Sequence, residues 1–368
     1  MNRRVCHIIT DLDVGGAETT LWRLLLNEKR NMENSLIVSL SDIGPMGVKL
    51  QESGFKVIAL NIKRNNPLSV LASGILLHKK LLEFRPDIIL AWMYHACLIS
   101  ILFKYKYRIV WNIRHSLEFY HSEKIHTKLI IRICGLYSKH PNAIIFNSHN
   151  SRQQHYQIAN YIHKNLITVQ NGIDINVFKP KSKRKLEDAN NIVIGHVGNY
   201  RKIKGHSVFL QAMSLLANQY DISLAMAGNH VDPNNQKLLR LLKEYGLLDI
   251  TSLHGSIRNM SEYYNSLDIF VLSSHSEGFP NVLVEAMSSG LPCIGTNVGD
   301  VPHLLENEYI VAPNDHVKLA SRCRLFLNDE NKREKCGVSN RELIIKNNSI
   351  EEMVYKYTRV YEDVCSST

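Results

Sequence analysis

Long apolar runs are missing from this sequence, and so are paired cysteines. No stretch of about 18 consecutive apolar residues occurs, which argues against a membrane-spanning helix. The first residues, MNRRVCHIITDLDVGG, carry two arginines but no apolar core of the length that a secretion signal needs. The seven cysteines form no C-x-x-C pair, and their odd number and scatter argue against a disulfide framework or a zinc site. We therefore expect a cytoplasmic protein in a reducing setting.

The composition is that of a globular chain with fewer acids than bases. Hydrophobic residues make up 45% of the chain and charged residues 21%, which indicates a globular protein. The length of 368 residues predicts two domains of ordinary size. The chain has 44 Lys and Arg against 34 Asp and Glu, a net charge of +10. This excess indicates an anionic partner, which could be nucleic acid, anionic lipid or a phosphorylated substrate. Aromatic–basic recognition modules are absent and the bases cluster in one half, so we expect no nucleic-acid partner.

Two groups of basic residues stand out in the first half. One is the short run KYKYR, and the other is spaced by four residues on a helix expected over 121–139. A neighbouring stripe of that helix is apolar, a pattern typical of a helix at an anionic membrane surface. A solvated face beside an ordinary core stripe explains the pattern equally well. The bases are Lys104, Lys106, Arg108, Lys124, Lys128 and Arg132, and the apolar stripe is Ile125, Leu129, Ile133 and Leu136.

Strand-like and helix-like stretches alternate in two series, separated by the lysine-rich stretch 178–190. Helices are expected, for example, at Ala17–Asn27, Pro67–Phe84 and His149–Tyr161. This alternation predicts an α/β protein with two parallel, doubly wound sheets, whose ligands bind beyond the carboxyl ends of the strands. The expected strands are Val5–Thr10, Leu36–Leu40, Lys56–Asn61, Asp87–Trp92, Arg108–Ile113, Ala143–Asn147, Leu166–Gln170, Ile192–Val197, Ile222–Ala227, Thr251–His254, Asp268–Leu272, Pro292–Thr296 and Tyr309–Val311.

The stretch SEGFPNVLVEAM, residues 276–287, places two glutamates on either side of a turn. The apolar run before it, Asp268–Leu272, predicts a buried strand, and Pro280 suits the first position of a helix. Glu277 then lies in the loop after the strand, and Glu285 lies about one turn into the helix. A helix start offers free backbone N–H groups to an anion, and carboxylates beside it suit hydroxyl groups. The pattern therefore predicts a ligand that has both phosphate and hydroxyl groups.

Other candidate site residues follow strands in both halves. Gly15 and Gly16 open a helix after the first strand, where a plain tight turn is the commoner explanation. Arg201 and Lys204 lie in the loop after the first strand of the second half, where they could neutralise a diphosphate. His115 follows an apolar strand, a place where a lone histidine is more often structural than functional.

Taken together, these motifs resemble those of the family 4 glycosyltransferases, retaining nucleotide-sugar enzymes with the two-domain GT-B architecture. The resemblance runs over almost the whole chain and is most specific in the E-x7-E region, residues 276–287. GGAE at 15–18, WMYH at 92–95 and NGID at 171–174 are similar to other family motifs. The closing stretch 349–364 is similar to the helix that crosses back to the first domain in GT-B enzymes.

The resemblance implies a role for each candidate in the second half. Glu277 and the backbone after it would hold hydroxyls of the donor sugar, while Glu285 would bind the ribose hydroxyls. Asn281 and the helix start would face the diphosphate. The family usually has an arginine directly after the first glycine of the loop, where this chain has Asn199. Arg201, two residues further on, would take its place.

The resemblance also implies a front-face mechanism, in which the departing phosphate oxygen accepts the proton of the acceptor hydroxyl. His115 would support the sugar near the reacting centre, and two cations would stabilise the leaving group in place of a metal. No metal or other cofactor is expected. The expected catalytic residues are His115, Glu277, Arg201 and Lys204; the donor-binding residues are Gly15, Gly16, Asn199, Arg201, Lys204, Arg258, Glu277, Gly278, Phe279, Pro280, Asn281, Val282 and Glu285; the acceptor-side residues are Glu18, Tyr94, His95 and Arg114.

By resemblance, residues 1–180 form an acceptor-binding domain, 181–348 a nucleotide-sugar-binding domain facing it across a cleft, and 349–368 the returning helix. The implied activity moves a hexose or N-acetylhexosamine from a nucleotide sugar, UDP by expectation, to a lipid-linked oligosaccharide. The setting would be O-antigen or capsule synthesis at the inner face of the cell membrane. Two alternatives stay open: a GT-B-fold epimerase acting on the nucleotide sugar, and a basic nucleic-acid-binding protein.

Overall fold

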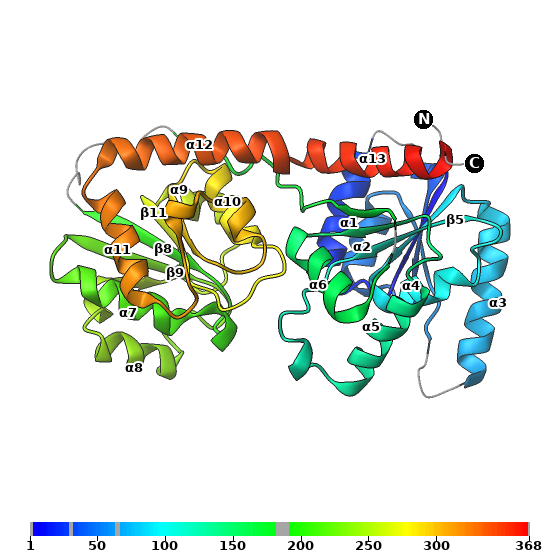
Figure 1. The fold of residues 1–368 in the computed structure, drawn as a ribbon, viewed down its shortest axis with the longest axis horizontal. Coiled ribbons are helices and arrows are strands. Elements are labelled where there is room, and N and C mark those ends of the chain that lie inside the picture. The colour runs from blue at the N-terminus through cyan, green and yellow to red at the C-terminus, as the bar shows by residue number, and fades with distance from the viewer. Residues whose placement is uncertain (1–2, 29–31, 63–66, 163, 182–190, 367–368) are drawn as a thin grey trace. The chain divides into compact units, whose positions relative to one another are not determined.

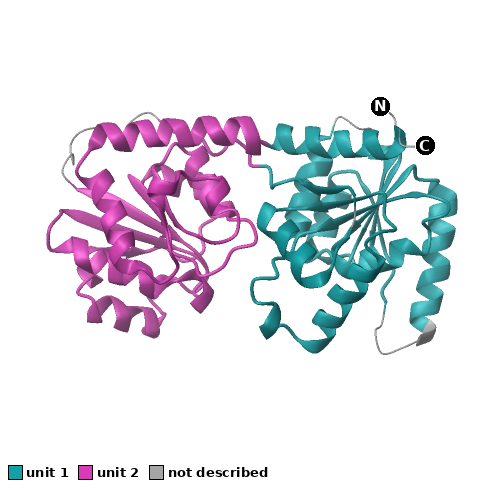
Figure 2. Ribbon diagram, in the orientation of Figure 1, with its two compact units in different colours: residues 1–172, 350–368 teal, residues 173–349 magenta. Residues whose placement is uncertain are grey.

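A computed structural model of the chain describes residues 3–28, 32–62, 67–162, 164–181 and 191–366 (Figure 1). They form two compact units (Figure 2). Unit 1 consists of residues 1–172 together with 350–368, and unit 2 of residues 173–349. Most of the lysine-rich stretch that was expected to link the two domains, 178–190, lies outside the described residues.

Unit 1 contains a seven-stranded parallel sheet in the order β3-β2-β1-β4-β5-β6-β7. The order reverses beside β1, so that β1 pairs with both β2 and β4. Loops that follow neighbouring strands at such a reversal commonly form ligand sites. The strands are β1 (Val5–Ile9), β2 (Ser35–Ser39), β3 (Lys56–Ala59), β4 (Ile88–Trp92), β5 (Arg108–Ile113), β6 (Ala143–Phe146) and β7 (Leu166–Thr168).

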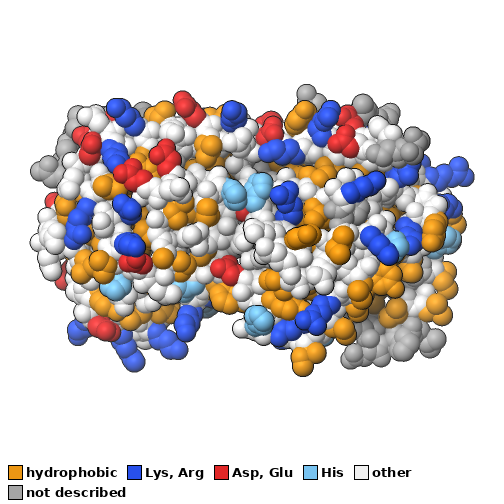
Figure 3. All heavy atoms as spheres, viewed as in Figure 1, with side chains coloured by type: hydrophobic (Ala, Val, Ile, Leu, Met, Phe, Trp, Pro, Cys, Tyr) orange, Lys and Arg blue, Asp and Glu red, His pale blue; other side chains and the backbone are white. Residues whose placement is uncertain are grey.

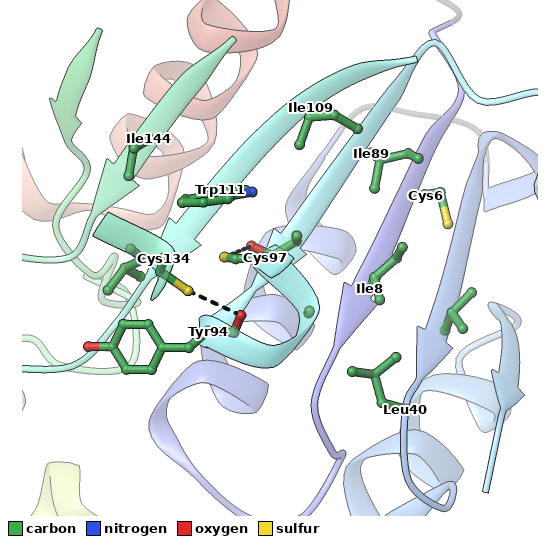
Figure 4. Packing of buried hydrophobic residues seen from close by; sticks show 14 of the residues in the cluster. Cys6, Ile8, Leu40, Ile89, Tyr94, Cys97, Ile109, Trp111, Cys134 and Ile144 are labelled. Carbon is green, nitrogen blue, oxygen red and sulfur yellow. Dashed lines mark hydrogen bonds between the residues drawn. The ribbon is translucent and has the colours of Figure 1, made fainter. Parts of the chain in front are cut away.

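Helices cover both faces of this sheet. On each face, side chains of the strands and helices pack together in one buried hydrophobic cluster. Alternate residues of β1 point to opposite faces, with Ile8 in one cluster and Ile9 in the other. Figure 4 shows the first cluster, where Trp111 lies near Cys97 and the Cys134 thiol donates to the carbonyl oxygen of Tyr94. The helices are α1 (Gly16–Asn27), α2 (Gly44–Glu52), α3 (Pro67–Phe84), α4 (Met93–Ile101), α5 (Ile125–Tyr137), α6 (His149–Ala159) and α13 (Ile350–Ser366).

Unit 2 contains a six-stranded parallel sheet in the order β10-β9-β8-β11-β12-β13, which reverses beside β8. The strands are β8 (Ile192–Val197), β9 (Ile222–Ala227), β10 (Thr251–Leu253), β11 (Ile269–Leu272), β12 (Cys293–Thr296) and β13 (Ile310–Val311). Its helices are α7 (His206–Ala217), α8 (Gln236–Glu244), α9 (Met260–Asn265), α10 (Asn281–Ser288), α11 (His316–Leu327) and α12 (Glu330–Asn348). In both units every strand expected from the sequence is present, within two residues at each end.

The first division between the units falls after Gly172, whereas the sequence suggested a boundary after Pro180. The intervening segment packs on unit 2 because Ile173 and Phe178 are buried in its core. Arg341 of α12 reinforces this packing by donating to the carbonyl oxygen of Phe178 at 3.0 Å.

The C-terminal helix α13 packs on unit 1, against α1. Its buried residue Tyr357 accepts a hydrogen bond from Nδ2 of Asn112 in β5 at 2.7 Å. Arg114 donates to the same hydroxyl at 3.1 Å. A helix distant in sequence thereby completes the core of the first unit, with Met353, Val360 and Val364 buried beside it.

The helix expected over 121–139 is shorter, because α5 runs only from Ile125 to Tyr137. Lys124 has extended backbone angles and is the residue that precedes the helix. The preceding residues form a separate short turn, Tyr120–Ser122. Lys128 still reaches back to this turn, donating to the carbonyl oxygen of His121 at 2.6 Å.

Candidate functional site

The loops after β8 and β11 lie next to each other, because these two strands pair where the order of the unit 2 sheet reverses. Two close backbone contacts join the loops. Gly205 has a φ of +65°, and a Cβ at this position would lie 1.9 Å from the carbonyl oxygen of Ser273. Ser273 Oγ in turn donates to the carbonyl oxygen of Gly205 at 3.0 Å. Only glycine allows the two loops to approach this closely.

Glu277 lies in the second of these loops and is almost completely buried, with 8% of its surface exposed. Its Oε1 atom accepts hydrogen bonds from Lys204 Nζ at 2.7 Å and from Ser274 Oγ at 2.6 Å. Its Oε2 atom has no hydrogen-bond partner among the described residues. The carboxylate is therefore held by an ion pair on one oxygen, and the other oxygen can accept hydroxyl groups of a ligand.

The start of α10 supplies backbone donors beside this carboxylate. The N–H groups of Gly278, Phe279 and Val282 have no hydrogen-bond partner within the part of the chain that the structure describes. Phe279 and Pro280 are themselves buried, so this turn would contact a ligand through its backbone rather than through those side chains. Unpaired N–H groups at a helix start suit an anion, as the sequence predicted.

Glu285 lies one turn further along α10, on the same helix face as Asn281. Its Oε2 atom accepts a hydrogen bond from the hydroxyl of Tyr264 at 3.0 Å. The Tyr264 side chain is completely buried, so it fixes the orientation of the Glu285 carboxylate from the protein interior. Burial and the nearby Glu285 both raise the pKa of Tyr264 well above its usual value, so this hydroxyl keeps its proton.

The remaining predicted donor residues of unit 2 are more exposed. Arg201 is exposed, and its guanidinium has no partner among the described residues. Its backbone N–H donates to the carbonyl oxygen of Asn199 at 2.7 Å. Asn199 in turn accepts from the backbone N–H of Asn229 at 3.1 Å. Arg258 is exposed in the loop after β10.

The predicted residues near the start of α1 belong to unit 1. Gly16 is the first residue of α1, and Gly15 precedes it. A Cβ on Gly15 would lie 2.3 Å from Oε2 of Glu18, which shows that the carboxylate folds back over the helix start. Burial raises the pKa of Glu18. A partly buried acid at this position can accept hydrogen bonds from a polar ligand.

His115 follows β5 and forms an ion pair with Glu123, with 3.3 Å between Nε2 and Oε1. Burial lowers the pKa of His115, and the neighbouring Glu123 partly offsets this effect. Tyr94, predicted on the acceptor side, has only 4% of its surface exposed. Its ring centroid lies 5.9 Å from that of His115, so the buried Tyr94 packs against the histidine ring.

Arg114 is committed to contacts within unit 1. Its guanidinium donates to the Tyr357 hydroxyl and to Oδ1 of Asn171, and it lies 5.8 Å from the ring of Trp92. These contacts attach α13 and the chain near Asn171 to the sheet. His95, by contrast, is exposed at the first turn of α4.

The structure brings Lys204 and Glu277 together, and it places Glu285 on the helix that follows Glu277. Gly15, Gly16, His115 and the acceptor-side residues belong to the other unit. Sequence reasoning missed three partners. Ser274 and Glu123 are polar residues three and eight positions from Glu277 and His115, but nothing in the sequence links Tyr264 to Glu285.

A family model described as "Glycosyl transferases group 1" matches residues 177–343, almost the whole of unit 2. The match includes the loop after β8, the loop after β11 and α10. It therefore contains the ion pair, the free helix start and both glutamates of the site described above.

Curated relatives match part of the chain. The N-acetyl-alpha-D-glucosaminyl L-malate synthase of Bacillus anthracis is 29% identical over 209 residues, which cover 55% of this chain and 54% of the relative. The capsular polysaccharide biosynthesis glycosyltransferase CapM of Staphylococcus aureus is 29% identical over 181 residues, covering 47% of this chain and 46% of the relative. The chain thus spans about half the length of these relatives.

Solved structures match over nearly the whole chain. The Anabaena protein HepE, solved in complex with UDP, superposes with a TM-score of 0.85 at 18% identity, covering 98% of this chain and all of HepE. A glycosyltransferase from Rickettsia africae superposes with a TM-score of 0.82 at 18% identity, covering both chains completely. At such identity the likeness concerns the fold. The chain has the GT-B fold, and its residues 177–343 match the model of the group 1 glycosyltransferases.

Proposed function

We propose that the chain is a retaining glycosyltransferase that moves a hexose or N-acetylhexosamine from a UDP-sugar to a hydroxyl of a lipid-linked oligosaccharide. The observation that carries the proposal is the buried Glu277 carboxylate, held by Lys204 beside the open helix start of α10. A free carboxylate oxygen suits sugar hydroxyls, and unpaired N–H groups suit a diphosphate. The HepE complex with UDP and the name of CapM support a nucleotide donor and a surface polysaccharide product.

In this proposal the bond between the sugar and the diphosphate breaks while the acceptor hydroxyl approaches on the same face. The leaving phosphate oxygen takes the hydroxyl proton, so no residue of the chain must act as the base. Arg201 and Lys204 stabilise the negative charge on the departing diphosphate, which is the task that a metal performs in other transferases. His115 supports the sugar near the reacting carbon.

The decisive experiment incubates the purified protein with UDP-sugars, with and without lipid-linked saccharides, and follows products by mass and NMR spectroscopy. We expect an α-linked product from an α-linked donor, and activity that persists in EDTA. Isomerisation of the UDP-sugar without an acceptor would support the epimerase instead. An inverted linkage would contradict the retaining mechanism, and loss of activity in EDTA would contradict metal independence.

Lys204 provides a second test of the diphosphate contact. The change Lys204→Ala should weaken binding of UDP by at least about tenfold, because a charge-assisted hydrogen bond contributes about 1.5–3 kcal/mol. Binding of uridine, which has no phosphate, should change little. The matched control is Lys202→Ala, an exposed lysine in the same turn. Equal losses for UDP and uridine would mean that Lys204 does not contact the phosphates.

We further propose that α5 attaches the enzyme to an anionic membrane surface, where a lipid-linked acceptor resides. The sequence left open whether the apolar stripe of this helix belongs to the core. Ile125, Leu129 and Leu136 are 85%, 58% and 75% exposed, so most of the stripe faces outward. Figure 3 shows hydrophobic side chains gathered on the surface of unit 1 around α5 and α3. Shallow insertion of such a stripe is typical of interfacial helices.

Three of the basic residues, Lys124, Lys128 and Arg132, belong to α5 or directly precede it. Within the described residues, none of the six bases of the two clusters forms an ion pair with an acid. Their charges are therefore not neutralised by an acid, and a basic residue near an anionic surface contributes about 1 kcal/mol. No helix in the described parts of the chain has the length and hydrophobicity needed to cross a bilayer.

A further inference from the structure

His115 is held in place from three directions within unit 1. Its Nε2 atom lies 3.3 Å from Oε1 of Glu123, and both side chains are more than two-thirds buried. Its backbone carbonyl oxygen accepts a hydrogen bond from Ser151 Oγ at 2.6 Å. The ring of Tyr94 lies against the imidazole, with centroids 5.9 Å apart. These three contacts fix both the backbone and the imidazole ring of His115.

The groups behind His115 have defined hydrogen-bonding roles. Nδ1 of the buried His155 lies 2.8 Å from the carbonyl oxygen of Ser151, which can only accept, so Nδ1 carries the proton. Nε2 of His155 therefore accepts from the Tyr94 hydroxyl at 2.8 Å. Burial lowers the pKa of His155 to about 3, so the ring is neutral at physiological pH. Tyr94 thus donates its hydroxyl proton to His155, and it does not donate to the nitrogens of His115.

The contact with Glu123 determines which nitrogen of His115 carries the proton. A carboxylate only accepts hydrogen bonds, so the Nε2 atom that faces it must donate. In a neutral imidazole the other nitrogen, Nδ1, then has a free lone pair. Burial keeps the imidazole neutral by lowering its pKa. Nδ1 has no hydrogen-bond partner among the described residues.

We propose that Glu123 is a positioning residue, which fixes the tautomer of His115 so that Nδ1 accepts a hydrogen bond from a hydroxyl of the bound saccharide. The inference rests on the proposed glycosyltransferase activity and assigns the chemistry of one contact within it. A histidine fixed in this way distinguishes a hydroxyl, which can donate, from an ether or carbonyl oxygen, which cannot. No proton is transferred in this contact.

The tautomer of His115 can be measured directly by NMR of protein labelled with nitrogen-15 in histidine. We expect the unmodified protein at neutral pH to carry the proton on Nε2. Glu123→Ala should produce a mixture of tautomers and reduce kcat/KM by about twofold, because one hydrogen bond to the sugar is lost in part of the population. Glu123→Gln should preserve the tautomer and most of the activity, since the amide oxygen can also accept from Nε2.

The pH dependence of kcat/KM should distinguish Glu123→Gln from a variant that only disturbs the local structure. The groups around His115 are Glu123 from the segment before α5, Tyr94 from α4 and His155 from α6. Of these, Glu123 raises the pKa of His115 through its charge and its hydrogen bond. Glu123→Gln should therefore move the acid limb of the rate profile to lower pH. The control Glu118→Ala, an exposed acid of the same loop, should leave tautomer and profile unchanged.

A proton on Nδ1, or a charged imidazole at pH 7, in the unmodified protein would overturn the proposal. An unchanged tautomer in Glu123→Ala would overturn it as well. Failure of the proposed function has a different signature: the protein would then turn over no UDP-sugar with any acceptor, while the NMR measurement would still report the tautomer.

Discussion

The two units share one scaffold but differ in their surfaces. Both sheets are parallel, and their first six strands have the same order, reversing beside the first strand of each unit. Unit 1 has 24 Lys and Arg against 15 Asp and Glu, whereas unit 2 has 20 against 19. Nearly all of the excess positive charge therefore lies in unit 1. The shared fold does not determine the partner; the loops and outer helix faces do.

Hydrophobic exposure follows the same division. In unit 1 the helices α3 and α5 each expose several large apolar side chains, with Leu71 and Ile75 of α3 64% and 65% exposed. The exposed apolar residues of unit 2, such as Val317 and Val338, are distributed over different helices. Unit 2 instead contains the ion pair between Lys204 and the buried Glu277. In the proposed function, unit 2 binds the donor, and unit 1 meets the acceptor and its membrane.

The strongest test of this contrast is the loss of the carboxylate in unit 2. Glu277→Gln should reduce transfer by about 100-fold, because it removes charge-assisted hydrogen bonds to sugar hydroxyls and leaves Lys204 without its partner. The measurement is kcat/KM with UDP-sugar and acceptor. The control is Glu262→Gln, whose side chain is 65% exposed. Full activity of a correctly folded Glu277→Gln variant would contradict the assigned site.

The opposite unit is tested by reversing the charge of α5. Replacing Lys124, Lys128 and Arg132 by Glu should weaken binding to anionic vesicles by at least about 100-fold, given about 1 kcal/mol for each base. Transfer to a lipid-linked acceptor should slow, while hydrolysis of the donor should not. Cosedimentation at low salt measures the binding.

The control for this charge reversal is the same substitution on a basic helix of unit 2, with Arg322, Arg324 and Lys318 of α11 replaced by Glu. These changes should leave vesicle binding unaltered. If the unmodified protein does not bind vesicles at low salt, the membrane part of the proposal fails and the assignment of the donor site remains.

A smaller effect is expected at Gly299, which supports the Glu277 loop. Its φ is +52°, and a Cβ would lie 2.5 Å from the carbonyl oxygen of Glu277. Gly299→Ala should lower the free energy of unfolding by about 2–3 kcal/mol, combining backbone strain with this clash. Gly246→Ala is the matched control, since its φ is +67° and nothing lies near its Cβ. It should cost only about 1 kcal/mol.

Thermal unfolding and UDP affinity distinguish the two glycine variants. Both should lower the melting temperature, but only Gly299→Ala should also weaken UDP-sugar binding, because it displaces the loop that carries Glu277. Equal effects of the two substitutions on affinity would show that the contact between Gly299 and the Glu277 loop does not shape the site.

The sequence predicted the fold well because hydrophobic periodicity and turn residues are local signals. The strands, the loop position of Glu277 and the helical position of Glu285 all follow from such signals. Two features could not be predicted in the same way. The bond between Lys204 and Glu277 joins residues 73 positions apart, and the exposure of the α5 stripe depends on what the fold leaves uncovered.

The smallest predicted effect concerns Tyr264, the partner that the sequence did not reveal. Tyr264→Phe removes the hydroxyl that orients Glu285, so UDP affinity should fall about fivefold, equivalent to about 1 kcal/mol. Tyr263→Phe is the matched control, because Tyr263 is also buried but its hydroxyl donates to the carbonyl oxygen of Ala225 at 2.7 Å. Both changes should destabilise unit 2 similarly, yet only Tyr264→Phe should reduce the preference for UDP over its 2′,3′-dideoxy analogue. An unchanged preference would mean that Glu285 does not bind the ribose hydroxyls, and the contrast between the units would then rest on the Glu277 loop alone.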